Sequence, residues 1–198
     1  SEMCIRDSGW VAREQILGNE ARSQVPPEFR TQYPLHANPP TLIFGLNTLL
    51  AEYEAELAKV HEDVTDVNSF AGVDGSAQSD MERAKQMREH LLALYEPWQR
   101  HYRWFRRTQR GQIKQWGREA SARNEGYRWR GRSATHVLTS GLDDYPRTAT
   151  PHVGELHLDL HSWMGLFAKS MARFAAALGL EDDAFEYETH IERITANV

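Results

Sequence analysis

Cysteine is nearly absent from this sequence: the 198 residues contain one, Cys4. A single cysteine excludes an internal disulfide framework and leaves no cluster of thiolates for a metal site. No apolar run reaches the roughly 18 residues that a membrane-spanning helix needs. Lys and Arg (23) are outnumbered by Asp and Glu (28). This balance argues against a nucleic acid as the partner.

The first eight residues are interpreted as foreign to the protein. Residues 1–8 are what one reading frame of a common transposase-type sequencing adaptor would encode, and an eight-residue match rarely arises by chance. We therefore expect the natural sequence to begin near Gly9, within a longer gene, and Cys4 to leave with the adaptor. The chain also stops at Val198 without a loop signal. Residues 9–198 are thus expected to be one partial domain, truncated at both ends.

Apolar residues recur with a helical period in four stretches of the chain. We expect helices over about residues 41–60, from a capping box at Ser79 to a kink or end at Pro97, over about 154–178, and from about Asp182 onward. The third is apolar nearly all round, which predicts burial, and Gly179 suits its C-terminal cap. Residues 9–40 and 111–150 are predicted to be loops, with short strand candidates at 127–129 and 136–138, and 64–78 a polar linker.

Long helices joined by long loops predict an all-α domain whose functional site lies on the loops. The loops combine charged and aromatic residues, the mixture that a sugar site needs for hydroxyl groups and for the C–H face of the ring. Residues 99–110 are rich in Arg and aromatics and would also suit stacking on bases. The acidity of the chain instead favours a solvated helix face, with arginine stems packed on aromatic rings.

Asp143 and Asp144 are the first candidates for chemistry. Adjacent acids between Gly141 and Pro146 most often form a turn, in which Asp side chains bond backbone amides. A catalytic role needs a loop site and a neighbour that raises the pKa of one carboxyl, which a second carboxyl can do. From the residues alone, both readings stay open.

Four separated motifs, in the expected order, carry a resemblance to a known family. They lie in residues 9–28, 37–42, 129–147 (with Ser-Gly-Leu-Asp-Asp-Tyr-Pro-Arg at 140–147) and 155–164 (with Glu-Leu-His-Leu-Asp at 155–159). Together they resemble glycoside hydrolase family 63, the family of the processing α-glucosidases, or mannosyl-oligosaccharide glucosidases. The resemblance implies part of an (α/α)6 barrel that carries its active site on long loops. It also implies removal of the terminal α-1,2-linked glucose from glucosylated high-mannose N-glycans by an inverting mechanism, without a cofactor.

That family works in the lumen of the endoplasmic reticulum, so the resemblance implies an oligosaccharide of a glycoprotein as the partner. Any membrane anchor would lie outside these residues. Two alternatives stay open: another α-glucosidase of the same barrel superfamily, and a non-catalytic helical paralogue that binds carbohydrate.

For the catalytic residues, the resemblance implies that Asp143, rather than Asp144, is the general acid. An inverting glycosidase also needs a carboxylate that activates water on the opposite face of the sugar. The family places that base in a Glu motif far toward the C-terminus, and no segment after Asp159 resembles it. We therefore expect the base beyond Val198, so that the chain carries half of the catalytic pair.

The same resemblance implies substrate contacts from several loop residues. They are Trp10, Arg13, Glu14, Gln15, Asn38, Trp129, Arg130, Asp144 and Arg147. Structural alternatives accompany them: a salt-bridged scaffold for residues 13–15, a helix cap for Asn38, core packing for at least one tryptophan, and a bond to Asp144 for Arg147.

His157 and His161 are spaced i, i+4 on an expected helix, a spacing that can bind zinc. Residue 158 is Leu rather than the Glu of the zinc motif, and no third ligand is evident. We therefore expect structural histidines and no metal site. Asp159, on the same helix, is expected to brace the acid loop rather than to react.

Overall fold

A computed structural model of the chain describes residues 8–13, 16–27, 30–65, 75–116, 125–135, 137–142 and 145–198. Within these ranges the regular elements are α1 (Gly18–Gln24), α2 (Leu42–Thr65), α3 (Gly75–Thr108), α4 (Leu158–Leu178) and α5 (Glu181–Thr195), with 3-10 turns η3 (Ile113–Trp116) and η4 (Leu138–Ser140). The described residues form no strand beyond one isolated bridge between Arg110 and Tyr127. The predicted all-α class is confirmed.

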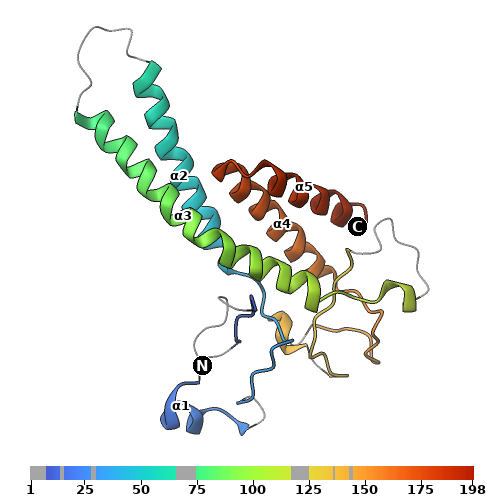
Figure 1. Cartoon of the computed structure of the whole chain (residues 1–198). Helices are drawn as coiled ribbons and strands as arrows, with labels where there is room; N and C mark the ends of the chain where they lie inside the picture. Colours follow the sequence, from blue (N-terminus) through green and yellow to red (C-terminus); the bar gives the residue numbers. More distant parts are fainter. Residues whose placement is uncertain are drawn as a thin grey trace.

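The four long helices form two antiparallel pairs (Figure 1). α2 and α3 run side by side, and α4 and α5 form a second hairpin beside them. α4 is the central element, because it contacts α2, α3 and α5. The loop-rich segments lie together at one end of the helices, where α2 and α4 begin and α3 and α5 end (Figure 1). No helix in the described part of the chain is long and apolar enough to cross a membrane.

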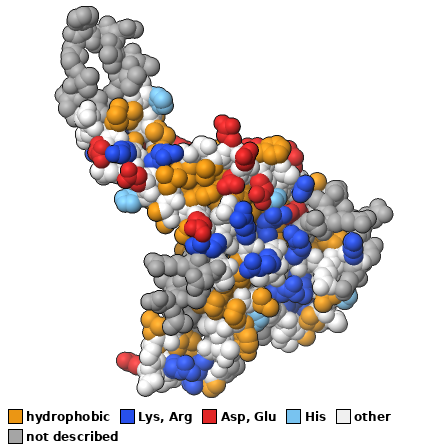
Figure 2. All heavy atoms as spheres, viewed as in Figure 1, with side chains coloured by type: hydrophobic (Ala, Val, Ile, Leu, Met, Phe, Trp, Pro, Cys, Tyr) orange, Lys and Arg blue, Asp and Glu red, His pale blue; other side chains and the backbone are white. Residues whose placement is uncertain are grey.

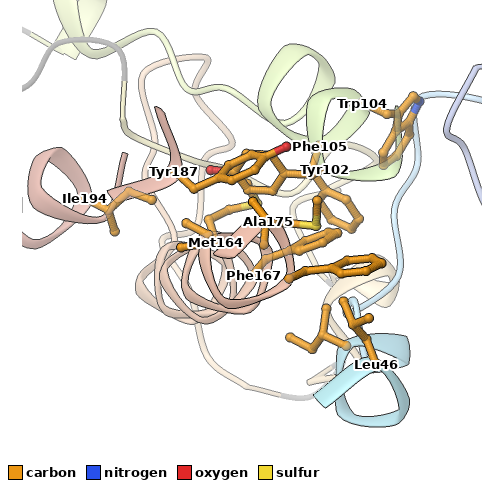
Figure 3. Close-up of a cluster of buried hydrophobic side chains, with 14 of the residues drawn as sticks. Leu46, Tyr102, Trp104, Phe105, Met164, Phe167, Ala175, Tyr187 and Ile194 are labelled. Carbon is orange, nitrogen blue, oxygen red and sulfur yellow. The ribbon is translucent and has the colours of Figure 1, made fainter. Parts of the chain in front are cut away.

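The core is built around α4, as its all-round apolar sequence predicts. Figure 3 shows Phe167 and Met164 of α4 between aromatic side chains of α3 and Leu46 of α2. Phe167 is fully buried and meets the rings of Tyr102 and Trp98 edge-on, at centroid distances of 5.1 and 5.9 Å. Burial of one such side chain stabilises a fold by about 1.5–3 kcal/mol. At its far end α4 stops at Gly179, whose φ of 76° forms the predicted left-handed cap.

The Arg- and aromatic-rich end of α3 has the arrangement predicted for a solvated helix face. His101, Tyr102, Trp104 and Phe105 are all buried, while Arg103 and Arg107 are exposed. Figure 2 shows Lys and Arg side chains gathering between the helices and the loop-rich half of the molecule. The aromatic rings of this segment therefore belong to the core and offer no face for stacking on bases.

Two features of α3 differ from expectation. The sequence predicted a kink or an end at Pro97, and the end does not occur, because the helix continues to Thr108. The backbone hydrogen bond that proline removes is outweighed by packing on both sides of it, where Tyr95 meets Phe174 and Trp98 meets Phe167. The helix also begins at Gly75, so Ser79 lies inside it and caps nothing. The predicted polar linker is shortened accordingly, since α2 reaches Thr65.

The loop regions differ from expectation in three places. Residues 127–129 form no strand, because pairing stops after the single bridge at Tyr127. For residues 136–138, Leu138 begins the turn η4 and His136 lies outside the described residues. α4 begins at Leu158 rather than near Gly154, because His157 is extended and donates its backbone N–H to the Tyr127 carbonyl at 2.9 Å. The short helix α1 was not predicted; it has no buried residue and hence no apolar stripe to reveal it.

Candidate active site

A cavity of about 670 Å³ lies between the beginning of α4 and the segment that precedes it in the loop-rich half. This volume falls in the range of small-molecule sites. The lining is mainly apolar with a few charged groups: Leu142, Tyr145, Pro146, Arg147, Thr148, Gly154, Glu155, Leu156, His157, Leu158, Asp159 and Ser162. Asp143 and Asp144 lie outside the described residues, but their flanking neighbours Leu142 and Tyr145 both line this cavity.

Arg147 is held in the cavity wall by Asp159. Its Nη2 and Nη1 donate to the two carboxylate oxygens of Asp159 at 2.8 and 3.3 Å. The indole N–H of Trp129 donates to the same carboxylate at 2.9 Å. Burial would raise the pKa of Asp159, but the bonds from Arg147 and Trp129 outweigh it and hold that pKa below its usual value. Asp159 is therefore a carboxylate that braces the segment after the acid pair, as expected from the sequence.

The position of Asp159 in the first turn of α4 adds to this effect. The N-terminus of a helix carries partial positive charge, which favours an anionic side chain there. On the other side of the pair, the Arg147 guanidinium lies 5.7 Å from the centroid of the Tyr145 ring. Arg147 is thus fixed between a carboxylate and an aromatic ring.

A second anchor lies one residue further along the chain. Thr148 donates its hydroxyl to Glu155 at 2.8 Å, and Arg132 Nε lies 3.1 Å from the other carboxylate oxygen of Glu155. Arg132 also donates to the Thr148 carbonyl. The Arg132 and Glu155 side chains are only 3% and 8% exposed. Asp159 in the first turn of α4 therefore holds Arg147 by an ion pair, and Glu155, just before the helix, holds Thr148 by a hydrogen bond.

Both histidines of the i, i+4 pair are engaged with backbone groups. His157 Nδ1 accepts the backbone N–H of Trp129 at 3.0 Å, so in the neutral ring Nε2 carries the proton. Burial, together with the charge of Arg147, lowers the pKa of His157 and favours that neutral form. His161 Nε2 lies 2.8 Å from the Ile194 carbonyl. Within the residues that the structure describes, no group of three or more His, Cys, Asp or Glu side chains could hold a metal ion.

Trp129 and Arg130 bond to other parts of the protein, whereas the sequence suggested that they contact the substrate. Trp129 is 0% exposed, which leaves no ring face for a sugar. Arg130 donates from Nε to the carbonyl of Thr108, the last residue of α3, at 2.7 Å, and from Nη2 to the Arg110 carbonyl. The bond to Thr108 satisfies a carbonyl that the end of α3 leaves without an intrahelical partner. Neither residue lines the cavity.

The described candidate residues of the N-terminal segment do not line the cavity. Trp10 is half-buried, and its indole N–H donates to the His36 carbonyl at 3.0 Å. Arg13 is exposed. Partial burial of His36 lowers the pKa of that histidine, and the charge of Arg13 lowers it further. Asn38 is half-buried beside Pro39, and a Cβ built on Gly141 would lie 3.4 Å from Pro39. Glu14 and Gln15 lie outside the described residues.

Sequence reasoning missed three residues of this region. Glu155 was quoted only as part of a motif, Gln109 directly follows α3 without any pattern that marks it, and Thr139 precedes the acid pair as an ordinary small polar residue. All three are buried, with side-chain hydrogen bonds to distant segments. Only the Glu-x-His-x-Asp spacing at 155–159 offered a signal, since it places two carboxylates around the start of a helix.

The described residues thus form an all-helical domain with a cavity lined by arginine and carboxylate groups beside its loops. The sequence model of the glycosyl hydrolase family 63 C-terminal domain matches residues 3–198, and the chain belongs to this family.

Curated relatives agree with this assignment. The chain is 44% identical over 186 residues to a Schizosaccharomyces pombe protein named "Probable mannosyl-oligosaccharide glucosidase", covering 91% of the chain and 23% of that protein. It is 36% identical over 207 residues to the mannosyl-oligosaccharide glucosidase of Saccharomyces cerevisiae, covering 100% of the chain and 25% of that protein. It is 30% identical over 181 residues to "Alpha-glucosidase 2" of Arabidopsis thaliana, covering 88% and 19%. The chain thus spans a quarter or less of the length of these relatives.

Proposed function

We propose that this chain carries the acid-bearing half of the active site of a glycosidase that trims N-glycans. The observation that carries the proposal is the cavity at the start of α4, because the residues on both sides of Asp143 and Asp144 line it. The identities of 44% and 36% to mannosyl-oligosaccharide glucosidases support the same substrate class.

In this proposal Asp143 is the general acid of an inverting mechanism. It protonates the oxygen of the leaving sugar as the glycosidic bond breaks, while a second carboxylate takes a proton from the attacking water. In such enzymes the two carboxyl groups are about 6.5–9.5 Å apart, which leaves room for that water. The second carboxylate is supplied by a part of the longer protein outside this chain.

The cavity suits one neutral sugar ring with directed polar contacts. Apolar walls from Leu142, Tyr145 and Leu158 fit the C–H face of a ring, and the Arg147 guanidinium can donate to a hydroxyl without leaving Asp159. Arg13, Glu14, Gln15, Asn38 and Asp144 are the further proposed substrate contacts, with Trp10 beside them. Trp129 and Arg130 do not touch the sugar; Trp129 supports the site through its bond to Asp159, and Arg130 through its bond to the end of α3.

The bond cleaved in this proposal is the terminal α-1,2 linkage of a glucosylated high-mannose N-glycan. The corresponding place of work is the lumen of the endoplasmic reticulum, with the membrane anchor elsewhere in the longer protein. Another α-glucoside is the second candidate, because the relative named "Alpha-glucosidase 2" is also 30% identical. A fold does not fix which sugar its site accepts.

The test uses the natural full-length protein, meaning the longest natural product that contains residues 9–198. It is assayed for glucose release from a triglucosylated N-glycan and from maltose, and the anomer released is followed by NMR. Asp143→Asn should lower turnover by about three orders of magnitude or more with little loss of stability. Asp182→Asn, a change at an exposed acid of α5, is the matched control and should leave turnover unchanged.

Each failure of this test has a distinct meaning. If Asp144→Asn is far more damaging than Asp143→Asn, the acid is assigned one residue too early. If the full-length protein binds the glycan but releases no glucose, the chain belongs to a non-catalytic carbohydrate-binding paralogue. Release from maltose alone would favour the second candidate.

A further inference from the structure

The turn η4, which leads into the acid pair, follows Val137 of the hydrophobic core and makes a side-chain hydrogen bond to a residue outside the turn. In η4 the hydroxyl of Ser140 bonds locally, to the Val137 carbonyl at 2.7 Å and from the Leu142 amide at 3.0 Å. Thr139 instead donates its hydroxyl to the carbonyl of Arg130, earlier in the same loop-rich segment, at 2.9 Å. Thr139 is only 3% exposed, so water does not replace this bond.

Arg130 is in turn fixed by a fully buried glutamine. Its backbone N–H donates to Gln109 Oε1 at 3.0 Å, and the Gln109 amide donates to the Leu35 carbonyl at 2.8 Å and to the Thr108 hydroxyl at 3.0 Å. Gln109 is 0% exposed. One side chain thus joins the end of α3, the N-terminal segment and the Arg130 backbone.

We propose that Thr139 and Gln109 are positioning residues for the catalytic acid. The relay Gln109–Arg130–Thr139 fixes the point at which the chain leaves η4, with Leu142 as the first residue of the cavity wall. Neither residue lines the cavity, so each acts through the loop and not on the substrate. This inference rests on the proposed glycosidase function.

The two ends of the loop are held by different parts of the fold. Kinetic measurements can therefore distinguish loss of the relay, which should lower kcat, from damage to the cavity wall, which should raise KM. Arg147 and Thr148 are anchored to Asp159 and Glu155 at the start of α4, and these groups form much of the cavity wall. Loss of the Thr139 bond leaves that wall in place, and substrate binding with it. It loosens only the segment before the acid, where a misplacement of about 1 Å can cost about a hundredfold in rate.

The experiment compares three variants in the full-length protein. Thr139→Val keeps the shape of the side chain but removes its hydroxyl, Thr139→Ser keeps the hydroxyl, and Thr189→Val removes an equivalent hydroxyl-to-carbonyl bond on α5. We expect Thr139→Val to lower kcat about ten- to a hundredfold with KM within about threefold of wild type. Thr139→Ser should restore kcat, and Thr189→Val should leave it unchanged.

The pH profile separates positioning from a general loss of structure. The basic limb of kcat/KM reports the pKa of the acid that must be protonated. Thr139→Val should shift that limb, because the surroundings of the acid change, whereas partial unfolding lowers the rate at every pH. A basic limb and a kcat identical to those of Thr189→Val would overturn the inference.

Two outcomes need separate treatment. If Thr139→Val does not fold, Gln109→Met provides the same measurement; if both fail to fold while Asp143→Asn folds, the relay supports the fold and the inference is overturned. If Asp143→Asn abolishes activity and Thr139→Val does not alter it, only the positioning role fails. If activity survives in both Asp143→Asn and Asp144→Asn, the proposed function itself fails.

Discussion

The bond between Trp129 and Asp159 gives the sharpest test of how the site is supported. Trp129→Phe removes the indole N–H that donates to the carboxylate at 2.9 Å and part of a fully buried ring. A hydrogen bond to a charged group contributes about 1.5–3 kcal/mol. The Asp159 side chain is 19% exposed, so partial hydration favours the lower end. The lost apolar area adds about 1 kcal/mol, and we expect the free energy of unfolding to fall by about 2–4 kcal/mol.

The measurement is urea unfolding of the full-length protein, followed by the helix signal in circular dichroism. Trp163→Phe, at a half-buried tryptophan that meets Phe44 edge-on at 5.8 Å, is the matched control and should cost about 1 kcal/mol. Combining Trp129→Phe with Asp159→Asn isolates the pair. A coupling energy within about 0.3 kcal/mol of zero would refute the reasoning, because contacting partners should couple by more than that.

The same pair should show a defined pH dependence. Because the folded state lowers the pKa of Asp159 below 3.8, its contribution is present above that pH and is lost as the pH falls through the folded pKa. Trp129→Phe brings the folded pKa back toward the ordinary value. The difference in stability between wild type and Trp129→Phe should therefore shrink below about pH 4.

Three further predictions concern residues away from the cavity. Burial, and to a smaller extent the charge of Arg106, lowers the pKa of His190 from 6.5 to about 4. Between these two pH values the unfolded chain therefore binds a proton at His190 and the folded chain does not. Stability should thus fall by up to about 3 kcal/mol between about pH 6.5 and 4, and His190→Gln should flatten this slope in thermal melts; parallel slopes would contradict the assignment. At the N-terminus, deleting residues 1–8 should change neither folding nor activity, because these residues are interpreted as foreign to the protein and the bond that Ser8 accepts from the Trp10 backbone N–H is exposed. Gly9→Ala should instead detach residues 9–13, because Gly9 has a φ of +80° and a Cβ there would lie 2.1 Å from the Arg100 carbonyl oxygen; unchanged hydrogen exchange in residues 10–13 would show otherwise.

The sequence predicts the helices better than their ends. The periods that define α2, α4 and α5 include residues that do become buried, such as Leu46, Leu50 and Phe167, although Phe44 of α2 and Phe185 of α5 are exposed. Pro97 misled because its cost is local, while the aromatic contacts that outweigh it join residues more than 60 positions apart in sequence, as Trp98 and Phe167 do. The start of α4 misled for a similar reason, since His157 is kept extended by the distant backbone of Tyr127.

The site was predicted in its motifs but not in its connections. The motif Glu-Leu-His-Leu-Asp pointed to the right segment, and Asp159 does brace the loop through Arg147. No pattern in one sequence could show that Thr139 meets Arg130 or that Gln109 meets Leu35, because these bonds end on backbone carbonyls, which every residue possesses. A buried Trp129 was equally unreadable, since tryptophan suits both a sugar and a core.

The loop that carries the acid pair is anchored near the ends of two different helices, α3 and α4. The distance between the two ends of the loop therefore depends on how far α4 is shifted along α3. Thr139 connects one end of the loop, through Arg130 and Gln109, to the end of α3. Arg147 and Thr148 connect its other end to Asp159 in the first turn of α4 and to Glu155 just before that helix. A slide of α4 along α3 by a single residue would be about 1.5 Å, enough to move the two ends of the loop apart. The interlocked rings of Tyr102, Trp98 and Phe167 oppose such a slide. Substitutions in the α3–α4 interface, distant from the cavity, can therefore change the spacing between the two ends of the loop.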